Sequence, residues 1–81
     1  MPQEQLNRII EALAQLKEDT TVPRNVKSRI DHIISVLSSE QETSLKINKA
    51  LNELDEISSD NNLQPFTRTQ LWNISSMLEA I

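Results

Sequence analysis

The chain has 81 residues, a length that suits one small domain with a modest hydrophobic core. It contains neither cysteine nor glycine, which excludes disulfides, thiolate chemistry and the glycine-rich loops that bind phosphates or dinucleotides. A net charge of −4 disfavours broad contact with nucleic acid or anionic membranes. The sequence shows no signal segment and no long apolar run, so we expect a cytoplasmic protein that does not enter a membrane.

Apolar residues recur at helical spacing in four segments, which predicts an all-α protein. We expect a single helical domain over residues 1–81, with helices at about 3–18, 23–38, 43–58 and 65–80. The connections are short and polar, so the expected architecture is a compact antiparallel four-helix bundle built from two helical hairpins. Because no glycine is available to end a helix in the left-handed conformation, Asn61 and Asn62 are expected to take that role.

The start of the third helix is the least sharply marked. Ser39 and Glu42 have the spacing of a capping box, but no apolar run follows at once, so this helix is expected to begin between Gln41 and Ser44. The expected apolar stripe of the helix is Ile47, Leu51, Leu54 and Ile57, with Leu45 near its entry.

The fourth helix carries the only tryptophan of the chain and its only phenylalanine. Its apolar stripe is Leu71, Ile74, Leu78 and Ile81. Trp72 lies roughly 150° from the centre of that stripe, at about 100° per residue, so the helix has two apolar sides. Two interpretations follow: the helix is wedged between neighbours and Trp72 fills the core, or Trp72 contacts a second copy or another protein.

The residues around Trp72 are consistent with the second interpretation, in which Trp72 contacts a second copy or another protein. Arg68 precedes Trp72 by one turn, which predicts that its guanidinium stacks on the indole. Ser75 and Ser76 follow and are small enough to let another helix approach. The candidate protein contact therefore consists of Arg68, Trp72, Ser75 and Ser76.

Three basic residues, Arg24, Lys27 and Arg29, lie in the first turns of the second helix, where the helix dipole favours acids. They form a candidate contact for a small anion or an acidic partner. The alternative is that these side chains pair with acids nearby, namely Glu18, Asp19 or Asp31. No aromatic residue is interleaved with the basic residues, so binding of single-stranded nucleic acid is weakly supported.

His32 is the only histidine, and it lies nearly opposite the apolar stripe of its helix, so it is expected to face water. The residue three positions before it is Arg29, so the Glu-x-x-His pattern of metal-binding bundles is missing. Asp31 and His32 are adjacent and point about 100° apart on a helix, which disfavours a nucleophile triad. We therefore assign no catalytic, metal or cofactor-binding residue, and we expect neither an enzyme nor a small-molecule ligand.

Two stretches carry a resemblance to a known family. These are Asp19-Thr20-Thr21-Val22-Pro23-Arg24-Asn25-Val26 and Arg68-Thr69-Gln70-Leu71-Trp72-Asn73-Ile74, with support from Leu54-Asp55-Glu56-Ile57-Ser58. In them the chain resembles a family of short archaeal proteins, uncharacterised protein family 0147. The loop at residues 39–44 departs from the family pattern, in which a proline commonly leads into the third helix. The resemblance implies a compact four-helix cytoplasmic protein and implies no activity.

The resulting hypothesis is a small non-enzymatic helical interaction or scaffold protein of unknown biochemical role. It would bind a protein partner or self-associate through the fourth helix. An alternative is an accessory protein of RNA or ribosomal machinery that uses Arg24, Lys27 and Arg29. A third hypothesis, an enzyme of unknown reaction, requires a pocket with convergent polar groups.

Overall fold

The computed structural model describes residues 2–60 and 62–81, with the side chain of Pro2 left aside. These residues form four α-helices and no strand. The helices are α1 (Pro2–Lys17), α2 (Arg24–Ser38), α3 (Thr43–Ser58) and α4 (Pro65–Glu79). The prediction of an all-α fold is confirmed.

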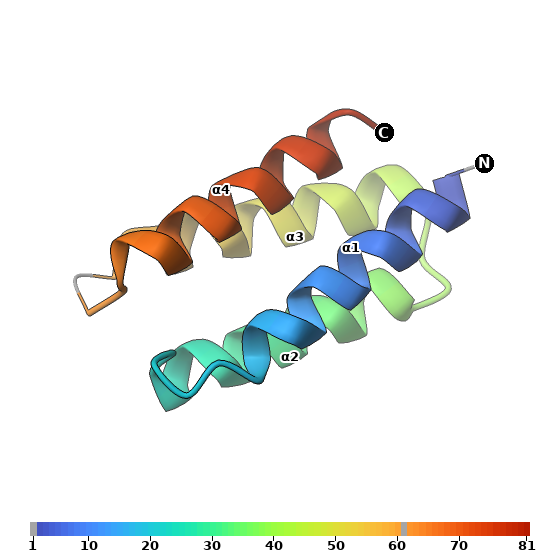
Figure 1. The fold of residues 1–81 in the computed structure, drawn as a ribbon. Helices are drawn as coiled ribbons and strands as arrows, with labels where there is room; N and C mark the ends of the chain where they lie inside the picture. The colour runs from blue at the N-terminus through green and yellow to red at the C-terminus, as the bar shows by residue number, and fades with distance from the viewer. Residues whose placement is uncertain (1, 61) are drawn as a thin grey trace.

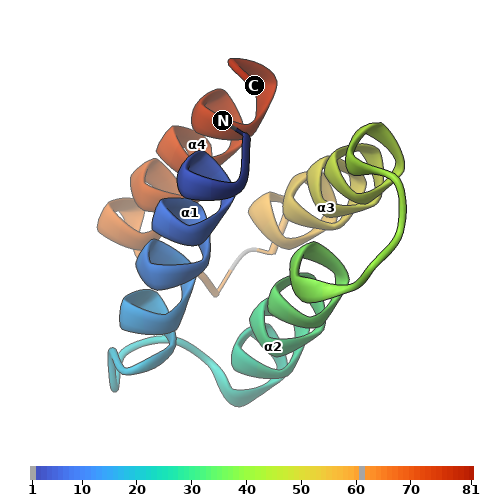
Figure 2. The same cartoon turned by 90° about the vertical axis from the view of Figure 1, so that its right-hand side faces the viewer.

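Consecutive helices run antiparallel, and the bundle is closed (Figure 1). Helix α2 packs against α1 and α3, and α4 packs against the same two helices. Figure 2 shows the bundle turned by 90° about the vertical axis, with the two chain ends at the same end of the bundle. The predicted antiparallel bundle of two helical hairpins is confirmed, and it measures 34 × 18 × 16 Å.

One continuous core fills the space between the helices. Its buried apolar residues are Leu6, Ile9, Leu13, Leu16, Val22, Val26, Ile30, Ile33, Leu37, Ala50, Leu54, Ile57, Leu63, Leu71, Ile74 and Leu78. Each helix contributes the side chains that recur every three or four residues, because these lie on one side of a helix. In a domain of this size, cutting one such Leu or Ile to Ala is expected to lower the free energy of unfolding by roughly 2–5 kcal/mol.

The buried side of α3 differs from the predicted stripe. It consists of Lys46, Ala50, Leu54 and Ile57. Ile47 and Leu51 are half-buried and pack at the edge of the core, whereas Leu45 is exposed. The prediction is therefore confirmed at Leu54 and Ile57, and it is wrong by one residue at the two earlier positions, where Lys46 and Ala50 are buried.

The buried Lys46 has a specific partner. Its ammonium Nζ donates a hydrogen bond of 3.0 Å to the backbone carbonyl of Ser39, at the end of α2. The apolar stem of the lysine can then cover the core while its charge reaches a polar group at the edge. Lys46 thus joins the end of α2 to the first turn of α3.

Ser39 and Glu42 have the spacing of a capping box but do not form one, although α3 does begin within the expected interval from Gln41 to Ser44. Helix α3 begins at Thr43, so Glu42 occupies the N-cap position, without a capping hydrogen bond from its side chain. Ser39 instead ends α2: its backbone N–H and its hydroxyl both donate to the carbonyl of Val36, at 3.2 and 2.7 Å. Ser39 lies too far ahead of the helix to cap it.

The end of α3 does not use a left-handed residue either. Its C-cap is Ser59, in the right-handed helical region, and Ser59 Oγ donates to the carbonyl of Glu56 at 2.7 Å. Asn62 was expected to adopt a positive φ, and this is wrong, because no described residue has a positive φ. Asn61 lies outside the described residues. Within the part of the chain that the structure covers, no helix is long and apolar enough to cross a membrane.

Candidate functional site

Trp72 is the most exposed large apolar side chain of the described residues, with 73% of its surface accessible. Leu71, Ile74 and Leu78 on the same helix are buried in the core, as predicted. The interpretation that Trp72 fills the core of its own chain is therefore wrong. The indole and the apolar stripe of α4 point in different directions, and the indole is left for solvent or a partner.

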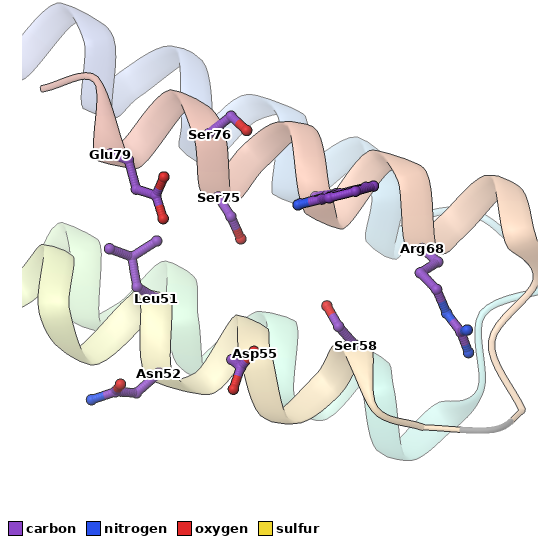
Figure 3. Close-up of a pocket in the computed structure, with 9 residues that line it drawn as sticks. Leu51, Asn52, Asp55, Ser58, Arg68, Ser75, Ser76 and Glu79 are labelled. Atoms are coloured by element: carbon purple, nitrogen blue, oxygen red, sulfur yellow. The ribbon is translucent and has the colours of Figure 1, made fainter.

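Trp72 borders a groove between α3 and α4 with a volume of about 470 Å³. The groove is lined by Leu51, Asn52, Asp55 and Ser58 of α3 and by Arg68, Trp72, Ser75, Ser76 and Glu79 of α4 (Figure 3). All four residues of the predicted protein contact are among them. The structure thus brings the predicted contact residues together, and it adds a second wall that α3 supplies.

Small side chains leave this groove open. Figure 3 shows Ser75 pointing from α4 toward α3 and Ser58 pointing from α3 toward α4. The hydroxyl of Ser58 also donates to the carbonyl of Leu54 in its own helix, at 2.9 Å, so its polar atom is satisfied within α3. Larger side chains at these two positions would fill the space, because the helices approach each other there.

Arg68 lies at the loop end of the groove. Its Nη2 donates a 3.0 Å hydrogen bond to the backbone carbonyl of Asp60, and Figure 3 shows the side chain extending toward the α3–α4 loop. Arg68 makes this contact with the loop instead of stacking on Trp72, so the predicted stack is wrong. A guanidinium carries five N–H donors, so Arg68 keeps donors for a further partner.

The basic residues of α2 do not form one site. Arg29 pairs across the α2–α3 seam with Glu53, at 3.6 Å, and with Glu56. Arg24 is exposed and Lys27 half-buried nearer the α1–α2 loop.

The expected acidic partners of these residues are only partly involved. Asp31 pairs with Lys17 rather than with Arg29. Asp19 accepts hydrogen bonds at Oδ1 from the hydroxyl and the backbone N–H of Thr21, which lower its pKa, and the positive charge of Lys27 lowers this pKa further while partial burial opposes the shift. Lys27 therefore influences Asp19 through the electrostatic interaction of their charges. Arg29 is paired with Glu53 and Glu56 of α3, so it does not contribute to the candidate anion contact.

His32 is exposed, as predicted, and its Nδ1 lies 2.6 Å from Oε2 of Glu53. Glu53 thus faces both Arg29 and His32, and only 16% of its side chain is accessible. This cluster joins α2 to α3 at the surface. Among residues 2–60 and 62–81, no group of three or more His, Asp or Glu side chains is placed to bind a metal ion.

Sequence reasoning missed the α3 wall of the groove and one charged residue of α4. Leu51, Asp55 and Ser58 follow each other at intervals of one helical turn, which signals a shared side of α3. Glu79 lies seven residues after Trp72, on the same side of α4. The sequence does not show that these two sides of α3 and α4 face each other.

Comparison with known proteins identifies relatives of the whole chain. The model of a family described as Uncharacterised protein family (UPF0147) matches residues 1–81. A UPF0147 protein of Archaeoglobus fulgidus is 38% identical over 81 residues, which cover 100% of this chain and 93% of that protein. Another, of Methanosarcina mazei, is 35% identical over 79 residues, 96% of this chain and 85% of that protein. The resemblance inferred from the sequence is confirmed.

Two crystal structures share the fold. That of MMP1188, a protein of unknown function, has a TM-score of 0.93 at 41% identity and covers 100% of this chain and 93% of that one. That of a UPF0147 protein from Thermoplasma acidophilum has a TM-score of 0.89 at 37% identity, with coverage of 96% and 93%. These structures agree on the helical fold described above.

Proposed function

The chain belongs to the uncharacterised protein family UPF0147, and we propose that it is a small non-enzymatic protein-interaction module that binds through the outer surface of α4. The observation that carries the proposal is the exposure of Trp72 beside an open groove. An aromatic side chain buries 150–250 Å² in a contact, which corresponds to roughly 4–6 kcal/mol of hydrophobic free energy. A partner that covers the exposed part of Trp72 gains a share of this free energy, because the loss of freedom on association offsets the rest.

The outer surface of α4 is free of charge. We call it the α4 face; it consists of the exposed residues Pro65, Phe66, Thr69, Trp72, Asn73, Ser76, Met77 and Ala80. The charged residues of this helix, Arg68 and Glu79, both line the groove at the edge of the face. The centres of protein interfaces are depleted in charge and enriched in Trp, Phe and Met, so the α4 face has the composition of an interface.

The non-enzymatic part of the proposal is supported by the position of the titratable groups. The only histidine of the chain, His32, lies at the α2–α3 seam next to Glu53, away from the groove. Asp55 and Glu79 come from different helices at an open surface, where solvent screens their charges. This arrangement supports recognition of a partner better than it supports proton transfer, which requires a positioned acid or base with a matched pKa.

Site-specific photo-cross-linking in the cells that make the protein tests the proposal. The photo-reactive residue p-benzoylphenylalanine replaces Trp72 in one variant and Ser28, an exposed residue of α2, in a matched control. We expect a discrete protein adduct from position 72 and none from position 28. Absence of an adduct at position 72, or equal adducts at both positions, would overturn the proposed surface.

A further inference from the structure

The residues Arg68, Trp72, Ser75 and Glu79 form a stripe along the groove edge of α4, which we call the groove stripe. Their spacings of 4, 3 and 4 positions keep them on one side of a helix. The series 4, 3, 4 is symmetric, so the stripe has the same spacing in both directions along the helix. When two such stripes meet antiparallel, Arg68 of one therefore lies opposite Glu79 of the other, and Trp72 lies opposite Ser75.

We propose that the partner of this surface is a second copy of the chain, bound about a two-fold axis with the two α4 helices antiparallel. The inference rests on the proposed function, because it names the partner that covers Trp72 and the groove beside it. A two-fold interface requires a surface that is complementary to itself, so that each contact occurs twice. The groove stripe meets that requirement in both size and charge.

The size match pairs the largest side chain with one of the smallest. Trp72 is 73% exposed and projects beside a groove of about 470 Å³, whose α4 wall includes Ser75 and Ser76. In the antiparallel arrangement the indole of each copy lies against the serines of its partner and enters the partner's groove. A large residue packed against a small one allows two helices to approach closely.

The charge match involves the two charged residues of α4. Two copies that each carry a net charge of −4 repel one another, so association favours a surface without like-charge contacts. The groove stripe carries one charge of each sign, and the two-fold arrangement places Arg68 opposite Glu79 at both ends of the stripe, whereas Asp55 of the α3 wall adds a negative charge beside them. Arg68 uses one donor on the carbonyl of Asp60 and has others for the partner's carboxylate.

The interface is expected to be small. Helix α4 has 15 residues and is therefore about 22 Å long, so one side of it offers only a narrow strip of surface. A standard stable interface buries about 800 Å² on each partner. The contact must therefore extend over the α3 wall, onto Leu51, Asn52 and Asp55. Interfaces at the low end of this range are transient, and we expect association in the micromolar range.

Charge reversal tests the pairing of Arg68 with Glu79. Sedimentation velocity over roughly 1 µM to 1 mM gives the concentration of half-association for the parent chain, whose monomer mass is 9.3 kDa. Arg68→Glu and Glu79→Arg each create two like-charged contacts, and each should raise that concentration about tenfold. An equimolar mixture of the two variants should associate as well as the parent chain does, because each mixed pair restores both attractive contacts.

The mixture separates this geometry from an effect on folding, since a loop destabilised by loss of the Arg68–Asp60 contact would remain so after mixing. A chain that stays monomeric over the whole range overturns the two-fold proposal. So does a dimer that is indifferent to both substitutions. A cross-link from position 72 to a different protein, together with a monomeric chain, would leave the proposed function standing and refute self-association alone.

Discussion

Leu71 and Trp72 are neighbours in the chain, yet Leu71 is completely buried whereas Trp72 is 73% exposed. The difference follows from the rotation of about 100° per residue on a helix, which turns Leu71 into the core and Trp72 toward the groove. The side chains of α4 that form the core are thus different from the exposed ones proposed for contact. The two roles can be separated by substitution at adjacent positions.

Trp72→Ala is expected to change the free energy of unfolding by no more than about 0.5 kcal/mol, because the indole makes little contact with the core. Leu71→Ala is the matched control and should lower it by roughly 2–5 kcal/mol, because it opens a cavity. Urea unfolding followed by circular dichroism measures both. If Trp72→Ala were as destabilising as Leu71→Ala, the indole would be part of the core and would not be free to contact a partner.

Thr67 offers a stabilising substitution. Its side chain is buried, and its Oγ1 has no hydrogen-bond partner among the described residues. Thr67→Val removes an unsatisfied hydroxyl at nearly constant shape, so we expect the free energy of unfolding to rise by roughly 1–2 kcal/mol. Thr69→Val is the control: that hydroxyl is exposed and donates to the carbonyl of Pro65 at 3.0 Å, so no stabilisation is expected. A destabilised Thr67→Val protein would indicate that the hydroxyl has a partner in solution.

Asp19 makes stability depend on pH. Hydrogen bonds from Thr21 hold its pKa below the ordinary value, with a further contribution from Lys27. The folded state therefore favours the carboxylate, and the resulting stabilisation is present above the ordinary pKa and lost as the pH falls through the lowered one. The difference in melting temperature between the parent chain and Asp19→Asn should shrink on acidification. Thr21→Ala should reduce the same pH dependence, and a difference that stays constant with pH would contradict this assignment.

Glu53 joins α2 to α3 through Arg29 and His32. Glu53→Gln keeps the size of the side chain and removes its charge, so we expect a loss of roughly 0.5–1 kcal/mol in the free energy of unfolding at low salt. This loss should diminish in high salt, because salt screens charges at the surface. Glu11→Gln, on the exposed side of α1, should have no comparable effect. Equal and salt-independent losses in both variants would argue against the ion pairs.

The fold was predictable where apolar spacing was regular. Leu71, Ile74 and Leu78 lie in the core because their spacing puts them on one side of α4. The start of α3 at Thr43 was also within the expected interval, but the buried side of its first turns was not predictable, because Lys46 is buried and Leu45 is exposed. A lysine that reaches a carbonyl of another segment, here Ser39, depends on how the chain turns between α2 and α3, and periodicity carries no information about this turn.

The candidate site was predictable on one of its two sides. Arg68, Trp72, Ser75 and Ser76 could be placed together because helical geometry relates residues of one segment. Their α3 neighbours, such as Asp55, depend on the pairing and register of two helices, which a single sequence does not state. Whether Trp72 lies inside or outside depended on the same packing, since its angle on the helix does not say what covers it.

Fluorescence reports directly on the burial of Trp72 by a second copy, because Trp72 is the only indole in the chain. The emission spectrum is recorded from roughly 1 µM to 1 mM, over the range expected for association. We expect the emission to shift to the blue and acrylamide quenching to be lost as Trp72 leaves water, at the same concentration of half-association as in the sedimentation data. Emission that remains unshifted and fully quenchable at every concentration would contradict the burial of Trp72 by a second copy.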